Sequence, residues 1–222
     1  MSTTLPDVPT VPHVIEGDPA HLEGIEWLLT NGIGGFAMGT ALGVNRRKYH
    51  TMLNAASNPP VERIATVNRL DEQVLLDPGT PNQESIDLAL HATASGEIGP
   101  GDPARVVRFE KDATTCRWTF TYGASSMTKE LRLGWRRNCC AIRYTIRAHR
   151  KQRLVVRPRV TLRDFHDVLE RVDSTRLSVE ARARGCTVQA DGQSIEIVAD
   201  AGSFERRDDI GPTVVRDAYY AL

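Results

Sequence analysis

Side chains that could do chemistry gather in two segments of this sequence. Residues 26–53 contain five glycines between positions 32 and 43, followed by a basic and aromatic run at 46–50. Glycine is favoured where the backbone needs a positive φ or a close approach, so we expect a built loop that presents polar groups. Residues 163–166 read Arg-Asp-Phe-His. Guanidinium, carboxylate and imidazole groups form the directional hydrogen bonds that hydroxyl-rich ligands require.

The candidate site residues come from three short stretches of these segments. We expect them to contact a ligand or a neighbouring domain, and they are Asn31, Gly34, Gly35, Arg47, Tyr49, His50, Arg163, Asp164 and His166. Each also has a purely structural interpretation. The glycines can form tight turns between short strands, Asp164 can cap backbone amides at a corner, and the histidines can be satisfied groups at the edge of the core.

Aromatic rings in the same region could stack on the apolar face of a ligand ring. Trp27 and Tyr49 flank the glycine-rich segment and are the better ligand candidates, although we expect Trp27 to be a core residue. Trp118 and Trp135 lie in segments where apolar and polar residues alternate. We expect both of them in the core.

Two other kinds of site have weaker support. Residues 32–35 do not fit Gly-x-Gly-x-x-Gly, and neither Gly-Lys-Ser/Thr nor a helical pattern follows them, so we expect no phosphate cradle. His50, His166 and Asp164 supply the ligand types of a site with two histidines and one carboxylate. Nothing in their spacing supports that reading. We therefore expect neither a metal nor another cofactor.

The elements that must position these side chains read as β-strands. Apolar and polar residues alternate with a period of two over several stretches, which are 116–122, 130–135, 140–146, 153–163 and 177–197. Helical periodicity is nearly absent. Many short strands of this kind predict an all-β fold, a large antiparallel β-sandwich with few or no helices.

Turn and breaker residues refine this expectation. Asp191-Gly192 separates two alternating runs and predicts a tight hairpin turn. Pro158 interrupts a strand-like run, so that strand should lie at a sheet edge or carry a bulge. Residues 77–104 are rich in glycine and proline, and we expect a long loop with at most one short strand near 86–90.

Composition and charge exclude several classes of protein. The 222 residues carry 28 Lys plus Arg and 28 Asp plus Glu, and this neutral balance argues against a nucleic-acid partner. The four cysteines form no Cys-x-x-Cys pair, so we expect reduced, partly buried thiols. No signal peptide and no apolar run of roughly 18 residues is seen, which predicts a cytoplasmic protein without a membrane partner. We expect a disordered lead over residues 1–20 and a single domain over 21–222.

The order of motifs along the chain resembles a known family. Residues 26–40 read Glu-Trp-Leu-Leu-Thr-Asn-Gly-Ile-Gly-Gly-Phe-Ala-Met-Gly-Thr, and a basic pair and Tyr49-His50 follow. Further matching motifs lie at 59–63, 70–72, 157–158 and 163–166. Together they resemble the opening of bacterial and archaeal glycogen debranching enzymes, the amylo-α-1,6-glucosidases. Where the family usually continues Tyr-His with Gly-Leu-Leu, this chain has Thr51-Met52-Leu53.

The resemblance implies an N-terminal, supersandwich-like domain. In a complete enzyme it would serve the hydrolysis of α-1,6-linked branch stubs in glycogen or limit dextrin. The resemblance puts the hydrolytic carboxylates in a helical (α/α) barrel that follows this domain, so we expect that barrel to be absent here and no catalytic residue in this chain. The domain would brace the barrel and contribute loops to the substrate cleft.

Glycoside hydrolysis usually needs two carboxyl groups across the scissile bond. The chain's own candidates are Glu26, Asp71, Glu72 and Asp164, and sequence spacing pairs none of them. Two alternatives therefore stay open beside the debranching module. The chain could be a stand-alone carbohydrate-binding module, or an interaction module that docks another domain without affinity for sugar.

Overall fold

The computed structural model describes residues 11–59, 61–92, 96–167 and 176–205. These residues form many strands, one short α-helix and one 3-10 helix. The elements are β1 (His13–Ile15), α1 (Pro19–Glu23), β2 (Glu26–Thr30), β3 (Phe36–Thr40), β4 (Thr51–Asn58), β5 (Glu62–Leu76), β6 (Glu84–Asp87), β7 (Leu90–Ala92), β8 (Ile98–Pro100), η1 (Pro103–Arg105), β9 (Val106–Lys111), β10 (Thr115–Tyr122), β11 (Ser125–Leu133), β12 (Cys140–Arg147), β13 (Gln152–Asp164), β14 (Ser178–Arg182), β15 (Gly185–Ala190) and β16 (Gln193–Val198).

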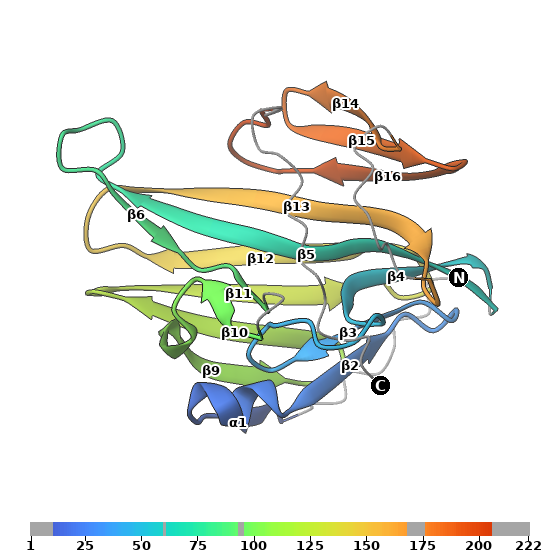
Figure 1. Ribbon diagram of the computed structural model, residues 1–222, viewed down its shortest axis with the longest axis horizontal. Helices are drawn as coiled ribbons and strands as arrows, with labels where there is room; N and C mark the ends of the chain where they lie inside the picture. The colour runs from blue at the N-terminus through green and yellow to red at the C-terminus, as the bar shows by residue number, and fades with distance from the viewer. Residues whose placement is uncertain (1–10, 60, 93–95, 168–175, 206–222) are drawn as a thin grey trace.

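Two antiparallel sheets face each other across one core (Figure 1). The five-stranded sheet has the order β1-β9-β10-β11-β12. The six-stranded sheet has the order β13-β5-β4-β3-β2, with β6 paired to β5. The expected all-β sandwich is confirmed, and neighbouring strands pair antiparallel in both sheets.

Alternation along the strands builds the core. In β10 the side chains of Cys116, Trp118 and Phe120 are buried between the sheets, and the residues between them are more exposed. The Trp118 ring meets Trp27 of β2 edge-on, with 5.5 Å between ring centroids, and Phe109 of β9 at 5.3 Å. These rings join β2 of the six-stranded sheet to β9 and β10 of the five-stranded sheet. Trp27 is the core residue that the sequence predicts.

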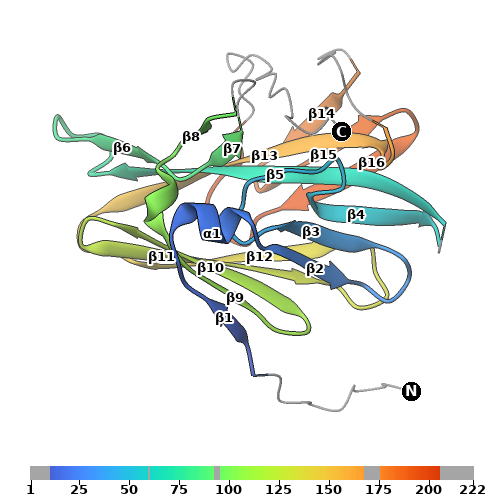
Figure 2. The same ribbon diagram turned by 60° about the horizontal axis from the view of Figure 1, so that its bottom comes forward.

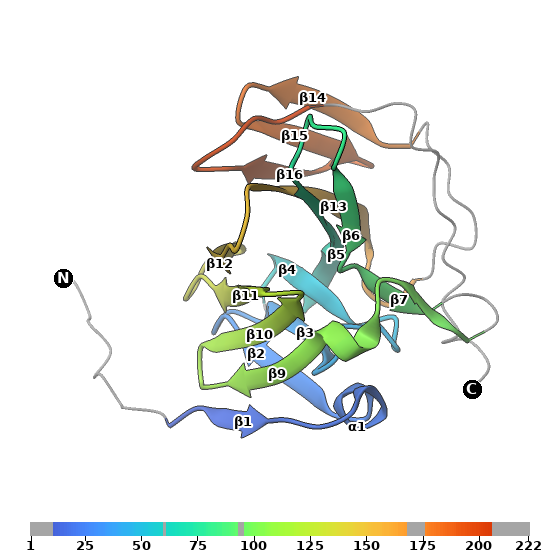
Figure 3. The same ribbon diagram turned by 90° about the vertical axis from the view of Figure 1, so that its left-hand side faces the viewer.

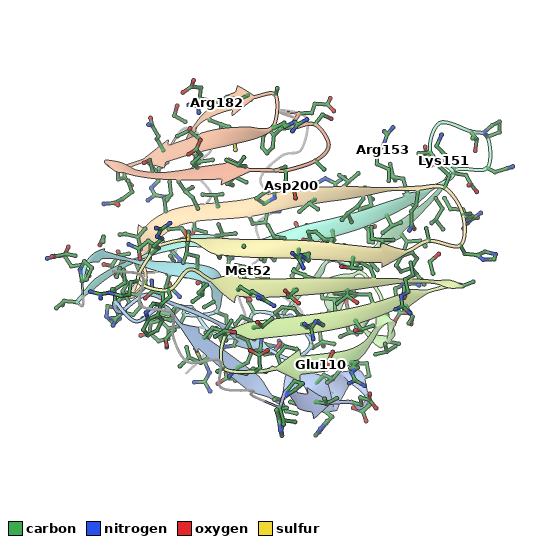
Figure 4. All side chains as sticks on the ribbon, turned by 180° about the vertical axis from the view of Figure 1, so that it is seen from behind. Met52, Glu110, Lys151, Arg153, Arg182 and Asp200 are labelled. Atoms are coloured by element: carbon green, nitrogen blue, oxygen red, sulfur yellow. The ribbon has the colours of Figure 1, made fainter. Side chains whose placement is uncertain are left out.

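A third layer covers part of the six-stranded sheet. Strands β14, β15 and β16 form a small antiparallel sheet that lies beyond β13 and β5 in Figure 3. Its inner residues Cys186 and Val188 form a second apolar cluster with Leu162 of β13 and Ile64 of β5. In Figure 4, Glu110 of β9 and Arg182 of β14 mark opposite margins of the layered molecule.

Two turn predictions are confirmed by the backbone. Asp191 and Gly192 connect β15 to β16 with φ of 49° and 75°, the pair of positive angles that a type I′ hairpin turn needs. Pro158 lies in β13, which is an edge strand of its sheet, and the pairing of β13 with β5 shifts register directly after Arg159. An edge strand tolerates proline because one of its sides has no partner strand that needs an N–H donor.

The expected disordered lead does not hold for the described part of residues 1–20. Residues 13–15 form β1, which pairs with β9, and Pro19 begins α1. Asp18 caps this helix by accepting the N–H of His21 at 2.8 Å, and Leu22 is fully buried. The helix lies beside the sandwich, near β2 and β9 (Figure 2). An aspartate before a proline is a helix-start signal that a five-residue helix makes easy to miss. Residues 1–10 lie outside the described residues.

The expected long loop at 77–104 is also corrected. Its described residues contain β6, β7, β8 and η1 rather than at most one short strand. β6 is the sixth strand of the six-stranded sheet and pairs with the second half of β5, while β7 and β8 form a separate hairpin. Strands of three or four residues are too short to show a period of two. Among the described residues, no helix is long and apolar enough to cross a membrane.

Candidate functional site

Asn31 organises the glycine loop between β2 and β3. Its fully buried side chain accepts the backbone N–H groups of Ile33 and Gly35 through Oδ1, at 3.1 and 2.8 Å. Its own backbone N–H donates to the carbonyl of Gly35 at 3.0 Å. An asparagine that bonds its neighbours' backbone in this way replaces regular secondary structure. The loop is therefore curled around one amide side chain.

Two glycines of this loop are required by close contacts. A Cβ on Gly35 would lie 2.4 Å from Nδ2 of Asn31 and 2.9 Å from the carbonyl oxygen of Asn54. A Cβ on Gly32, whose φ is 77°, would lie 2.6 Å from the ring of Trp135. The glycines thus serve close approach as well as turning.

The position of Trp135 corrects a prediction. The sequence pattern predicts this ring in the core, but 57% of its surface is exposed. β11 ends at Leu133, and Arg136 has a positive φ of 55°, so the strand stops two residues before Trp135 and does not carry the ring inward. The ring lies instead on the glycine loop at Gly32.

Asn138 bonds the β11–β12 connection to the glycine loop. Its side chain donates to the carbonyl of Ala56 at 2.6 Å and accepts the N–H of Ala56 at 2.9 Å. Nδ2 of Asn31 donates to Oδ1 of Asn138 at 3.3 Å and to the carbonyl of Arg137 at 3.1 Å, and the N–H of Arg136 donates to the carbonyl of Asn31 at 2.7 Å. Sequence reasoning missed Asn138 because its partners are distant in sequence.

His50 is buried, with both ring nitrogens engaged. Nδ1 accepts the backbone N–H of Arg46 at 3.0 Å, so the neutral ring carries its hydrogen on Nε2, which lies 3.2 Å from the Glu26 carboxylate. Arg47 donates to the same carboxylate oxygen at 2.5 Å. Burial lowers the pKa of His50 to about 4, although Glu26 acts in the opposite direction. The uncharged imidazole therefore holds the turn at 46–50 from the inside.

Arg163 ties the corner at 164–167 to Lys48. Its guanidinium donates to three carbonyls within the corner at 2.7–3.3 Å and to the carbonyl of Lys48 at 2.5 Å. Lys48 in turn donates from Nζ to the carbonyl of His166 at 2.7 Å. Asp164 accepts the N–H of His166 at 2.8 Å, which is the capping arrangement expected of a corner.

The three candidate stretches converge on one end of the six-stranded sheet. The hydroxyl of Tyr49 lies 3.3 Å from Nδ1 of His166, and the ring of Tyr49 lies 5.5 Å from that of Phe165. Arg63 of β5 donates to the carbonyl of Gly34 at 2.6 Å and covers the ring of Phe165 at 5.2 Å. One arginine thus connects the glycine loop to the corner, which sequence reasoning did not single out.

An open, largely apolar pocket of about 510 Å³ lies between these stretches. Its lining residues are Leu28, Thr30, Gly32, Gly34, Gly35, Phe36, Met38, Tyr49, Arg63 and Phe165. Gly34, Gly35 and Tyr49 are the candidate residues that line it. The candidates that do not line it are Asn31, Arg47, His50, Arg163, Asp164 and His166, which surround or support the stretches that do.

The carboxylates Asp71 and Glu72 lie away from this pocket. Asp71 accepts hydrogen bonds from Arg69 at 2.8 Å and from Arg159 at 2.5 Å. Burial alone would raise the pKa of Asp71, but the two arginines outweigh burial and hold that pKa below its usual range. A carboxylate in this state is a fixed structural anion.

Glu72 belongs to a buried ion pair between the two sheets. Its carboxylate lies 2.6 Å from Nζ of Lys129 in β11 and accepts the hydroxyl of Tyr144 in β12, also at 2.6 Å. Burial and the neighbouring carboxylate raise the pKa of Tyr144 well above its usual range, so the phenol stays a donor. Glu26 and Asp164 have the partners described above. None of the four carboxylates stands opposite another across the pocket.

The described residues contain no group of three or more His, Cys, Asp or Glu side chains that could hold a metal. His50 and His166 are bonded to Glu26 and Tyr49 respectively. The arrangement offers an apolar pocket edged by planar polar groups, which suits the recognition of a surface or ring.

A family described as the N-terminal domain of glycogen debranching enzyme matches residues 25–221. The match begins one residue before β2 and includes all three candidate stretches. Comparisons with curated proteins and with solved structures found no significant match.

Proposed function

The chain belongs to the family of glycogen debranching enzyme N-terminal domains, and we propose that it braces the catalytic part of such an enzyme and contributes loops to the rim of its substrate cleft. The complete enzyme would hydrolyse α-1,6-linked glucose stubs of glycogen or limit dextrin. The partners we propose are the α-glucan and a helical barrel domain, in the cytoplasm. By itself, the chain would not hydrolyse glucan.

The convergence of three distant stretches carries this proposal. The hydrogen bonds between Lys48 and His166, and between Arg63 and Gly34, bring residues 31–35, 46–50 and 163–166 to one surface. Loops that a rigid scaffold positions in this way are typical places for binding residues. Fixing them with buried groups such as Asn31 and Arg163 also keeps the loops ordered before a partner binds.

The contacts of the candidate carboxylates support the absence of hydrolysis by this chain alone. A glycosidase needs one carboxyl group that can donate a proton and a second that can act as base or nucleophile, several Å apart. Asp71 and Glu72 are each bonded to cationic side chains, and Glu26 is bonded to Arg47 and His50. These contacts give the three carboxylates structural roles within the fold.

Glucose release from a branched limit dextrin by the purified chain tests the proposal. We expect no release above a buffer control. Release that persists after repurification, and that disappears in Asp164→Asn, would place catalysis in this chain and overturn the proposal. Asp200→Asn, on an exposed turn after β16, is the matched control for removing one surface carboxylate.

A stand-alone carbohydrate-binding module is the second candidate function. The rings of Phe36, Tyr49 and Phe165 favour it, because aromatic faces in a pocket can stack on a sugar ring. Titration of the chain with glycogen and with a short branched maltodextrin separates the two functions. Saturable binding that is lost in Tyr49→Ala would favour the binding module, whereas no heat at millimolar ligand would favour the brace.

A further inference from the structure

The floor of the pocket is an apolar patch on the outward face of an edge strand. In β2, Trp27 and Leu29 point into the core, so Glu26, Leu28 and Thr30 point outward. Leu28 is 48% exposed and stands directly opposite Met38 of β3, with β2 at the end of its sheet. An outward leucine on an edge strand, next to an outward methionine on the neighbouring strand, is the kind of exposed surface that usually has a partner.

The walls of the pocket are aromatic and its polar groups are already bonded. Phe36 and Phe165 meet edge-on at 6.3 Å, and Arg63 lies over both rings. Of the polar side chains that line the pocket, Arg63 donates to the carbonyl of Gly34 and the hydroxyl of Tyr49 lies 3.3 Å from Nδ1 of His166. Few polar groups are left to satisfy the hydroxyls of a sugar, and this favours apolar side chains as the occupant.

The rim of the pocket is rich in cations without acidic partners. Lys48, Arg63, Arg136 and Arg137 form no ion pair with any described residue, and the last two lie beside Trp135 in the chain. The nearby carboxylates without an ion pair in that part of the chain are Glu62, Asp164 and Asp167, one fewer than these four cations. The rim therefore has an excess of positive charge around an apolar floor, which an acidic, apolar surface would complement.

We propose that this pocket is the docking site for an apolar segment flanked by carboxylates in the part of the debranching enzyme that follows this domain. Leu28, Met38 and Phe36 would receive the apolar side chains, and Arg136 and Arg137 would face the carboxylates. Trp135, exposed on the glycine loop, would be covered on docking. The inference rests on the proposed function and assigns to it one face of the sandwich and the chemistry of its partner.

The test uses this chain and the C-terminal portion of the same enzyme, produced as two separate polypeptides. Mixing them is followed by calorimetry and by the fluorescence of Trp135, because Trp27 and Trp118 are buried and respond little. We expect saturable binding with a blue shift of the emission. Trp135→Phe should lose the blue shift and keep the heat of binding. Binding should weaken several-fold between low and high salt, since rim charges are screened.

Two variants probe the two parts of the pocket. Leu28→Asp should weaken binding more than tenfold, and Arg136→Glu with Arg137→Glu should weaken it several-fold at low salt only. Val198→Asp is the matched control, because Val198 is also an exposed apolar residue of a strand, at 69% exposure in the third layer, and it should leave binding unchanged. Circular dichroism of each variant checks that it is folded, and the arginine variants keep the test valid if Leu28→Asp does not fold.

The outcomes that count against the inference are distinct. A C-terminal portion that binds Leu28→Asp and the arginine variants as tightly as wild type overturns the docking inference and leaves the proposed function standing. A portion that does not bind at all, or a gene that encodes none, overturns both. Displacement of the partner by maltohexaose, or a dimer of the chain that Leu28→Asp dissociates, reassigns the pocket to glucan or to a second copy and overturns the inference.

Discussion

The side-chain amides of Asn31 and Asn138 lie 3.3 Å apart, although 107 residues separate them in sequence. Asn31 holds the glycine loop of one sheet, and Asn138 is bonded through both of its polar atoms to Ala56 in β4. The pair thereby attaches the β11–β12 connection to the six-stranded sheet. The geometry of the candidate surface depends on this contact between two amides.

Replacing Asn31 should destabilise the fold. Asn31→Ala leaves the N–H groups of Ile33 and Gly35 without their acceptor, and unsatisfied buried groups cost about 1–3 kcal/mol. Chemical denaturation should therefore show a lower free energy of unfolding by that amount. Asn82→Ala, at an exposed position in the β5–β6 loop, is the control and should change little. Equal stability of the two variants would contradict the role given to Asn31.

Gly35 should not tolerate a methyl group. The Cβ of Gly35→Ala would lie 2.4 Å from the Asn31 amide and 2.9 Å from a backbone carbonyl, and overpacking of this kind costs about 1–3 kcal/mol. Gly24→Ala is the matched control, because its φ is −70° and the nearest atoms to its Cβ would be 3.5 Å away. Thermal melting should separate the two, and an unchanged melting temperature for Gly35→Ala would contradict the packing.

The stability of the chain should fall as His50 titrates. Burial holds the pKa of His50 in the folded protein at about 4, below its ordinary value of 6.5, so the unfolded chain takes up the proton first. Stability contributed by the neutral imidazole is fully present above pH 6.5 and is lost as the pH falls from there to about 4. Because a pKa difference of one between the folded and unfolded chain corresponds to about 1.4 kcal/mol, the loss should be on the order of 3 kcal/mol.

Urea unfolding at several pH values measures this slope. His50→Gln should be less stable than the wild type at about pH 7.5 but should show a shallower loss between roughly pH 6.5 and 4. Glu26 and Arg47, the charged groups beside the ring, remain in both proteins. Parallel pH profiles for the two proteins would show that His50 is not the group responsible.

The buried pair of Lys129 and Glu72 should be more costly to break than to replace. Lys129→Ala leaves the Glu72 carboxylate buried with only the hydroxyl of Tyr144, and removing one partner of a buried ion pair costs about 3–5 kcal/mol. Lys129→Met combined with Glu72→Leu should lose much less stability. If the double mutant loses as much free energy of unfolding as Lys129→Met and Glu72→Leu lose separately when added together, the two residues are not coupled.

Sequence patterns predicted the long strands of this fold better than the strand ends and the short strands. Apolar and polar residues alternate in 116–122 and 140–146, and the same residues alternate between more buried and more exposed side chains in β10 and β12. It failed at Trp135, because Gly134 and Arg136 end the strand where the residue pattern alone continues. The strands of three and four residues between 84 and 100 have no period to detect, since pairing with β5 or with each other defines them.

The candidate site was predictable as a set of stretches but not as a set of contacts. Glycine density and the Arg-Asp-Phe-His motif identified the loops that do come together at the pocket. The exposed or buried state of each side chain could not be read from spacing. His50 is buried and its ring accepts the N–H of Arg46, while Arg63 reaches both Gly34 and Phe165 across the surface.

Complementation of activity tests the central claim most directly. Glucose release from a branched limit dextrin is measured for this chain alone, for the C-terminal portion of the enzyme alone, and for the two mixed. If this chain braces the catalytic part and shapes its cleft, we expect no glucose release by this chain and little by the C-terminal portion. We expect a large increase in glucose release when the two are mixed. Full activity of the C-terminal portion without this chain, or release by this chain alone, would contradict the account.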